Sequence, residues 1–259
     1  MSHPAAIDWR PQTRRSDTLE IYLLGRVDFD SAVKLQQLWA EELATRTDRL
    51  GALFLCEHPP VVVIGREGNR SQLQVDDREL RTRLIELHWT NRGGGALVHA
   101  PGQLAAYPVV PLDRIGLGLA DYTAALQQAM IDVCAELRVN ATPHPHRPGV
   151  VCRTGQLGWI ASGVRNWITQ HGLFLNVAPA MHLMRLVTGT ETGNETGNET
   201  GTGIGPTSLA AQTSRPVSMH TTREHLVRHL TAQLGYDNWH IYTGHPLLGR
   251  TRKMVHVPA

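Results

Sequence analysis

The stretch Asn91–Pro108, NRGGGALVHAPGQLAAYP, is the part of this sequence from which the fold is interpreted. Three glycines follow Arg92, a histidine stands four residues after the last of them, and Pro-Gly-Gln leads into an apolar run that predicts a strand. Glycine adopts positive φ and lets a ligand approach the main chain closely, so consecutive glycines can present backbone N–H groups to an oxyanion or a carbonyl. On spacing alone the stretch is either a flexible turn or a loop shaped around a ligand.

The composition indicates a globular protein with a substantial core. Of 259 residues, 41% are hydrophobic and 19% charged, and the net charge of +2 gives no sign of a nucleic-acid or acidic membrane partner. No apolar run approaches the roughly 18 residues that a membrane span needs. Three cysteines are too few for a disulfide framework and lack metal-type spacing, so we expect no metal and a reducing, cytoplasmic setting.

Strand and helix patterns alternate along the chain without strict order. Two apolar runs within residues 52–68 are split by Pro59-Pro60, which predicts two strands joined at a proline-fixed corner. Further strands are predicted at 19–27, 104–112, 149–152, 157–164 and 172–177, and helices at 31–48, 121–138 and 221–234. This order favours one α+β domain built on a mixed β-sheet flanked by helices.

The helix boundaries are predicted from capping residues. Asp30 or Ser31 suits the start of the first helix, and Thr221 with Glu224 fits a capping box at the start of the last, which Gly235 ends. The apolar stripes that should face the core are Leu35, Leu38, Trp39 and Leu43, then Leu126, Met130, Val133 and Leu137, then Leu226, Leu230 and Leu234.

One segment does not have the pattern of a core. Residues 188–203, TGTETGNETGNETGTG, repeat a TGNE-like unit without an apolar residue, which predicts a mobile loop of low complexity. We therefore expect a loose N-terminal arm over 1–17, one folded domain over 18–236 that contains this loop, and a C-terminal extension over 237–259.

Four segments, in this order along the chain, form one pattern: EHPPVVVIGREGNRSQL, RGGGALVHAPGQLAAYPVVPL, PGVVCRTGQLGWIA and RNWITQHGLFLNV. Together they resemble the octanoyltransferases, also called lipoyl(octanoyl) transferases or lipoate–protein ligase B, over about residues 18–236. The resemblance implies the fold of the biotinyl/lipoyl protein ligase catalytic domain. It also implies transfer of an octanoyl group from octanoyl-acyl carrier protein to a lysine of lipoyl domains, in the lipoate biosynthesis and protein lipoylation pathway. The expected acceptors are lipoyl domains of 2-oxoacid dehydrogenase complexes and glycine cleavage H-type proteins, with no cofactor.

The resemblance also implies an acyl pocket with three walls. An eight-carbon chain needs an apolar slot and a few polar groups that place its carbonyl. The implied lining consists of Arg92, Gly93, Gly94, Gly95, Ala96, Leu97, Val98 and His99, then Trp159, Ile160 and Ala161, then His171, Gly172 and Leu173.

The sequence departs from the family at the two groups that carry its chemistry. The family uses a cysteine thiolate as the nucleophile and a lysine whose ammonium lowers the cysteine's pKa. The lysine position is Gln156, and the cysteine position is Thr190, or Thr202 if the repeat is an insertion. A threonine hydroxyl is a far weaker nucleophile and needs an adjacent base, which Gln156 is not. Cys152 is a candidate for a relocated nucleophile, against the alternative of a buried strand cysteine.

Three functions stay open from the sequence: an octanoyltransferase, an octanoyl- or lipoyl-binding pseudoenzyme, and an acyl-transfer enzyme that passes the group directly from carrier to acceptor. The ATP-dependent ligase branch would need a lysine where Gln156 stands. His144 and His146 are weak candidates for a metal site. The basic cluster GRTRKMVHV near the C-terminus is a candidate contact with an acidic carrier protein, although a solvated tail is the simpler interpretation.

Overall fold

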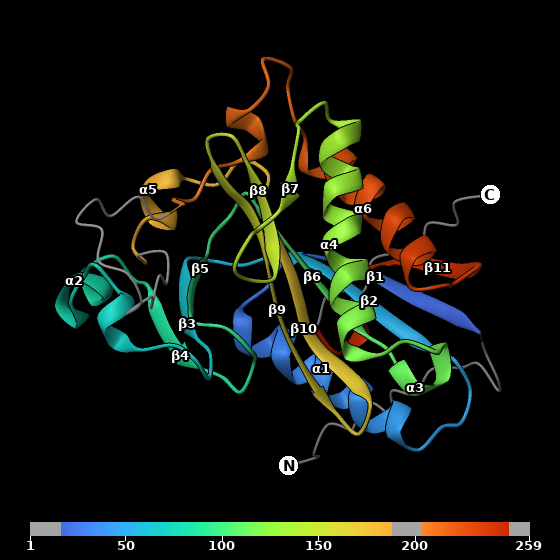
Figure 1. The fold of residues 1–259 in the computed structure, drawn as a ribbon. Coiled ribbons are helices and arrows are strands. Elements are labelled where there is room, and N and C mark those ends of the chain that lie inside the picture. The colour runs from blue at the N-terminus through green and yellow to red at the C-terminus, as the bar shows by residue number, and fades with distance from the viewer. Residues whose placement is uncertain (1–16, 188–203, 249–259) are drawn as a thin grey trace, which may run out of the picture.

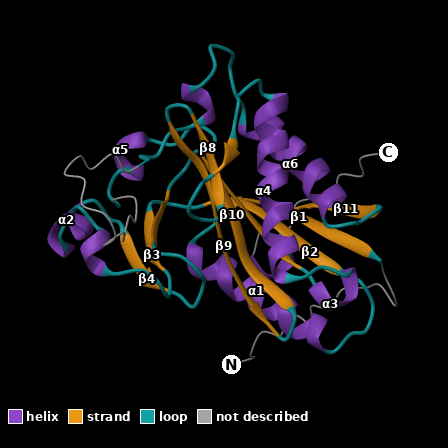
Figure 2. Ribbon diagram, viewed as in Figure 1, coloured by secondary structure: helices purple, strands orange, loops and turns teal. Residues whose placement is uncertain are grey.

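Two β-sheets and the helices that cover them make up the fold (Figures 1 and 2). The computed structural model describes residues 17–187 and 204–248. In the larger sheet β1 runs parallel to both of its neighbours and the remaining pairs are antiparallel, so the predicted mixed sheet is confirmed. Its eight strands lie in the order β11 (Asn238–Thr243), β1 (Thr18–Arg26), β2 (Gly51–Glu57), β6 (Gln103–Val109), β10 (Ile168–Asn176), β9 (Gly155–Arg165), β8 (Gly149–Cys152) and β7 (Thr142–Pro143).

Helices cover both faces of this sheet (Figure 1). On one face α4 (Leu119–Glu136) and α6 (Met219–Gln233) pack into one hydrophobic cluster with the sheet, and on the other α1 (Phe29–Ala44) forms a second. The central strands β2 and β6 are therefore buried on both sides, which is why they read as continuous apolar runs and not as alternating ones.

The first helix begins earlier than predicted. Asp28 is the N-cap, and its Oδ1 accepts a hydrogen bond from the Ser31 N–H at 2.8 Å, so the predicted caps Asp30 and Ser31 were wrong. The predicted stripe also fails at Leu38, which is 44% exposed. Gln36 faces the core instead and is 1% exposed, because its amide oxygen accepts a hydrogen bond from a main-chain N–H of β10.

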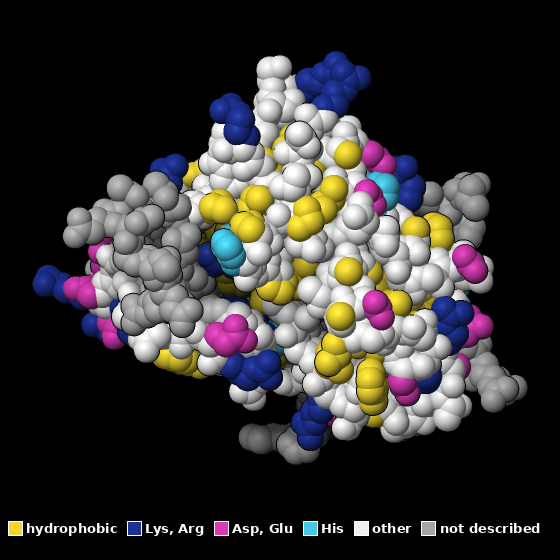
Figure 3. Space-filling model, in the orientation of Figure 1, with side chains coloured by type: hydrophobic (Ala, Val, Ile, Leu, Met, Phe, Trp, Pro, Cys, Tyr) yellow, Lys and Arg dark blue, Asp and Glu magenta, His cyan; other side chains and the backbone are white. Residues whose placement is uncertain are grey.

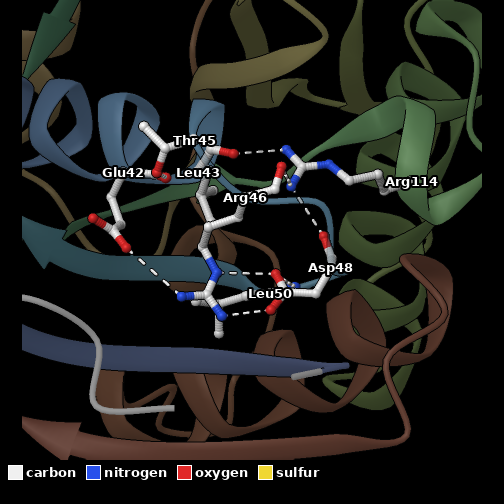
Figure 4. Close-up of polar contacts among 7 residues, drawn as sticks. All are labelled: Glu42, Leu43, Thr45, Arg46, Asp48, Leu50 and Arg114. Atoms are coloured by element: carbon white, nitrogen blue, oxygen red, sulfur yellow. Dashed lines mark hydrogen bonds and ion pairs between the residues drawn. The ribbon is translucent and has the colours of Figure 1, made fainter. Parts of the chain in front are cut away.

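An arginine from another part of the chain holds the end of α1 (Figure 4). Arg114, in the short helix α3 (Leu112–Ile115), donates to the main-chain oxygens of Leu43, Arg46 and Asp48 at 3.0–3.1 Å. These are carbonyls at and just beyond the C-terminus of α1, where the helix leaves its acceptors without partners. Arg46 in turn forms an ion pair with Asp48. The connection from α1 to β2 is thereby fixed.

The other two long helices match their predicted positions, with one cap wrong. The stripe residues of α4 and α6 lie in the core, except for the partly buried Leu137. The N-cap of α6 is Ser218, whose hydroxyl accepts from the Thr221 N–H at 3.0 Å, so the capping box on Thr221 and Glu224 was wrong. Gly235 ends the helix with φ +71°, as predicted.

The smaller sheet is a separate three-stranded layer, in the order β4 (Glu86–Trp89), β3 (Val61–Ile64) and β5 (Ala96–His99). Short helices α2 (Asp77–Thr82) and α5 (Met181–Met184) lie beside it and contribute to its own hydrophobic cluster (Figure 1). The corner at Pro59-Pro60 is confirmed: it takes the chain from β2 of the large sheet to β3 of the small one.

Some sequence expectations fall on other parts of the chain. Most of the N-terminal arm and all of the repeat at 188–203 lie outside the described residues. Residues 238–243, assigned to the C-terminal extension, form β11 at the edge of the large sheet. Within 17–187 and 204–248, no helix is long and apolar enough to span a membrane.

Candidate active site

The glycine loop, which consists of Arg92 and the three glycines that follow it (residues 92–95), lies against the end of β3. The N–H groups of Gly65, Arg66 and Glu67 donate to the oxygens of Gly95, Arg92 and Gly94 at 3.0–3.2 Å. The approach is close at Gly65, where an added Cβ would lie 2.3 Å from the Gly94 oxygen. Three backbone bonds and one glycine contact therefore fix the loop, which is not a free turn.

Arg92 places a positive charge inside this loop. Its side chain is fully buried, and its two terminal nitrogens donate to the main-chain oxygens of Val63 at 2.7 Å and Gly93 at 2.9 Å. Burial lowers the pKa of Arg92 to about 10, so the group stays charged at neutral pH. Its Nε has no hydrogen-bond partner among the described residues.

The glycine loop also reaches β9, which carries the second predicted wall. The Gly93 N–H donates to the Ser162 oxygen at 3.1 Å, at a part of β9 that β8 no longer pairs with. Alternation along the strand separates the predicted residues: Ile160 belongs to the cluster under α4, whereas Trp159 and Ala161 belong to the cluster under α1. The three side chains therefore do not form one wall.

The third wall lies on β10, directly beside the second. Gly172 pairs with Ala161, and Leu173 pairs with Ile160 and shares its cluster. Gly172 has no room for a side chain, because a Cβ would lie 2.3 Å from the Ala106 oxygen of β6. His171 lies within β10 with φ +56°, a left-handed backbone conformation that is uncommon for residues other than glycine. Its N–H donates to Gln36 Oε1 of α1 at 2.6 Å.

Three buried histidines surround Phe29, the first residue of α1. The Phe29 ring stacks on His99 with centroids 5.8 Å apart and on His171 at 6.4 Å, and meets the edge of His58 at 5.6 Å. Burial lowers the pKa of His58 and His171 to about 4, and that of His99 well below its usual value. The three rings are therefore neutral at pH 7. The His99 Nε2 and the His171 Nδ1 have no hydrogen-bond partner among the described residues.

The structure thus brings the first and last predicted segments to one place, while the lining of an acyl pocket stays a prediction. In β5, Ala96 and Val98 pack into the small-sheet cluster, and only Leu97 and His99 face the large sheet's side. Figure 3 shows this face of the molecule hollowed between the small sheet and β9, with hydrophobic, basic and histidine side chains around the hollow. A separate cavity of about 370 Å³ at the start of α1 is lined by none of the predicted site residues.

Gln156, at the family's lysine position, is buried in β9. It is 2% exposed, and its Nε2 donates to the Gly158 oxygen at 3.1 Å. Its main chain binds the segment after the repeat, because the Thr207 N–H donates to the Gln156 oxygen at 2.8 Å. Thr190 and Thr202, the candidate positions for the family's cysteine, lie outside the described residues.

Cys152 lies across a hairpin from Gln156. Strands β8 and β9 form this hairpin, in which Cys152 pairs with Gly155 and Val151 pairs with Gln156. The Cys152 sulfur lies 3.5 Å from the Thr154 hydroxyl and the side chain is partly buried. Cys56 and Cys134 are buried in the core.

Sequence reasoning did not single out four residues that the geometry places here: Phe29, His58, Gln103 and Asn176. Three of them stand inside the motifs that carry the resemblance, in EHPP, PGQL and LFLNV, so the motifs contained the signal. The region that the structure describes holds no group of three or more histidine, cysteine or carboxylate side chains able to bind a metal ion, around His144 and His146 or elsewhere. The C-terminal basic cluster lies beyond the described residues.

Comparison with known proteins gives one consistent result. Residues 30–231 match the model of the lipoyl protein ligase A/B catalytic domain. An octanoyltransferase of Geobacter metallireducens is 37% identical over 200 residues, which are 77% of this chain and 86% of that protein. An octanoyltransferase of Maridesulfovibrio salexigens is 32% identical over 200 residues, 77% of this chain and 89% of its own.

A solved structure agrees on the fold. It is the bipartite lipoate protein ligase of Thermoplasma acidophilum, described together with its E2 lipoyl domain. It superposes with a TM-score of 0.68 at 17% identity and covers 87% of both chains. At this identity the likeness confirms the expected ligase-type catalytic fold.

Proposed function

The chain belongs to the family of lipoyl protein ligase A/B catalytic domains, and we propose that it transfers an octanoyl group to lysine side chains in protein lipoylation. The observation that carries this conclusion is the 37% identity to an octanoyltransferase across 86% of that protein's length. The protein is an acyltransferase, and the buried, neutral histidines beside the glycine loop suit an uncharged acyl thioester.

The donor in this proposal is octanoyl-acyl carrier protein, and the acceptors are lipoyl domains of 2-oxoacid dehydrogenase complexes and H-type proteins of glycine cleavage. The octanoyltransferase relatives support this acceptor class, and the lipoate protein ligase that shares the fold is described together with its E2 lipoyl domain. The reaction takes place in the cytoplasm, in keeping with cysteines that are all free in the structure.

The route of transfer differs from the thiolate chemistry of the family. Gln156 is neutral, buried and already bonded to a main-chain oxygen, so it supplies neither a base nor a cation. Burial raises the pKa of the Cys134 thiol to about 12 and raises that of Cys56 as well, so neither is a thiolate at neutral pH. We infer that the acceptor lysine attacks the carrier thioester directly, without an octanoyl-enzyme intermediate.

The test is a transfer reaction with octanoyl-carrier protein and a lipoyl domain, followed by intact-mass measurement of all three proteins. We expect the lipoyl domain to gain one octanoyl group, while the enzyme shows no stable adduct before hydroxylamine treatment. A lipoyl domain whose target lysine is replaced by arginine is the matched control and should gain nothing. Bound octanoate without transfer would identify a binding protein. A hydroxylamine-sensitive adduct abolished by Cys152→Ser would identify a covalent route.

A further inference from the structure

A line of buried polar side chains leads from the glycine-loop strand to the segment that follows the repeat. The His99 Nδ1 lies 2.7 Å from Gln103 Oε1, and Gln103 Nε2 donates to Asn176 Oδ1 at 3.0 Å. Asn176 Nδ2 donates to the Thr207 main-chain oxygen at 2.9 Å. Gln103 and Asn176 are cross-strand partners on β6 and β10, and every side chain in the line is at most 3% exposed.

Main-chain oxygens fix the direction of these bonds. The Thr207 oxygen can only accept, so Asn176 must present its amide nitrogen there and its oxygen toward Gln103. Gln103 Nε2 also donates to the Val98 oxygen at 3.3 Å, which places Gln103 Oε1 toward the histidine. An amide oxygen has no proton to give, so His99 Nδ1 must carry the hydrogen. In a neutral ring Nε2 is then the atom with the free lone pair.

That lone pair has no hydrogen-bond partner among the described residues, although the ring is 1% exposed. A buried polar atom without a partner costs about 1–3 kcal/mol, so such atoms need an explanation. The His171 Nδ1 and the Arg92 Nε lack partners in the same way. The groups that act electrostatically on His99 are His58 after β2, Arg92 in the glycine loop and His171 on β10, while Phe29 and Phe174 contact its ring.

We propose that His99 Nε2 is the base that takes the proton from the attacking lysine, with Gln103 and Asn176 as positioning residues that hold its tautomer. The inference rests on the proposed function and its direct route. The free amine of the acceptor lysine attacks the thioester carbonyl carbon, the new C–N bond forms and the C–S bond breaks. The proton leaving the nitrogen passes to His99 Nε2 and from there to the departing sulfur, so that an amide and a thiol are the products.

The first experiment compares two buried histidines. In His99→Asn the amide nitrogen can still donate to Gln103 Oε1, but the base is gone; we expect kcat to fall at least about 100-fold with KM little changed. His245→Asn is the control, since His245 is as buried as His99, but its ring packs on Tyr22 and Phe54 under α1 and it lines a cavity that contains none of the predicted site residues. Thermal unfolding of both variants reports whether each is folded.

The second experiment reads the tautomer of the wild-type protein. Nitrogen NMR of the histidine rings at pH 7 should show His99 protonated at Nδ1 and unprotonated at Nε2. A ring protonated at Nε2, or an imidazolium, would overturn the proposal even if His99→Asn does not fold, and the predicted tautomer would then support it.

The outcomes separate the two proposals. Wild-type protein that transfers nothing refutes the proposed function and the role of His99 together. A wild type that transfers, with His99→Asn within tenfold of it or with His245→Asn equally impaired, refutes the role of His99 and leaves the function standing. Loss of kcat in folded His99→Asn alone supports both.

Discussion

Adding one methyl group at Gly65 tests whether the glycine loop is held by close backbone contact. In Gly65→Ala the Cβ would lie 2.3 Å from the Gly94 oxygen and 3.0 Å from the Arg92 oxygen, both main-chain atoms. The first contact is about 1 Å shorter than ordinary carbon–oxygen approaches of roughly 3.3–3.6 Å. Relief therefore requires movement of the loop. We expect a loss of about 1–3 kcal/mol in the free energy of unfolding, or about 5 °C in Tm.

The same movement displaces Arg92 and the chain leading to His99, so the transfer rate should fall by roughly 100-fold, as for a misplacement of about 1 Å. Gly163→Ala is the matched control: Gly163 lies in β9 beside the loop, and an added Cβ meets no atom within 4 Å. This variant should be neutral or more stable by up to about 1 kcal/mol. Urea unfolding and the transfer assay measure both effects, and equal behaviour of the two variants would refute the reasoning.

Buried histidines, Gln156 and Cys152 give three further expectations. His58 and His171 have a pKa of about 4 in the folded protein, so the unfolded chain, near the ordinary 6.5, takes up protons first. Each of the two histidines therefore contributes up to about 3 kcal/mol to the free energy of unfolding, which is fully present above pH ~6.5 and is lost as the pH falls to about 4. A free energy of unfolding in urea that does not change with pH between 7.5 and 4.5 would contradict this. Gln156→Lys puts an ammonium at a position that is 2% exposed, where Gln156 donates to the Gly158 oxygen. This change should lower the free energy of unfolding by about 2 kcal/mol or more, and it should not create an octanoyl adduct. A variant that is fully stable in thermal melts and acylated in mass spectra would contradict this expectation. Cys152→Ser should keep the transfer rate within about twofold, since within the described residues the hydrogen-bond contact of the sulfur is the Thr154 hydroxyl of its own hairpin. A large loss in the transfer assay would make Cys152 the nucleophile.

The sequence predicts the long elements of this fold well, for a physical reason. Helices α4 and α6 and the doubly buried strand β2 carry continuous patterns that burial imposes. Strands β4 and β5 have four residues each, too few to show a period, and were missed. That β2 and β3 belong to different sheets is also invisible in the sequence, because both are apolar runs and only their pairing partners differ.

The sequence identified candidate site residues by their motifs, but it did not predict how these residues are arranged in space. Arg92, His99 and His171 were singled out because their motifs are specific, and the structure brings their segments together. The partnership of Gln103 with Asn176 depends on the register of β6 against β10, which no local pattern encodes. The contiguous range 159–161 does not account for strand alternation, which places the side chain of Ile160 on the opposite face from those of Trp159 and Ala161.

The pairing of β1 with β11 has a consequence for the newly made chain. The contact between His240 and Glu20 joins residues 220 positions apart, and β11 is the last strand of the described chain to be synthesised. On the ribosome the outer edge of β1 therefore stays unpaired until residues 238–243 have emerged, and such long-range closure slows folding. An open strand edge is a template for pairing with other chains. Premature termination before residue 238 would leave that edge permanently open and make the fragment prone to self-association.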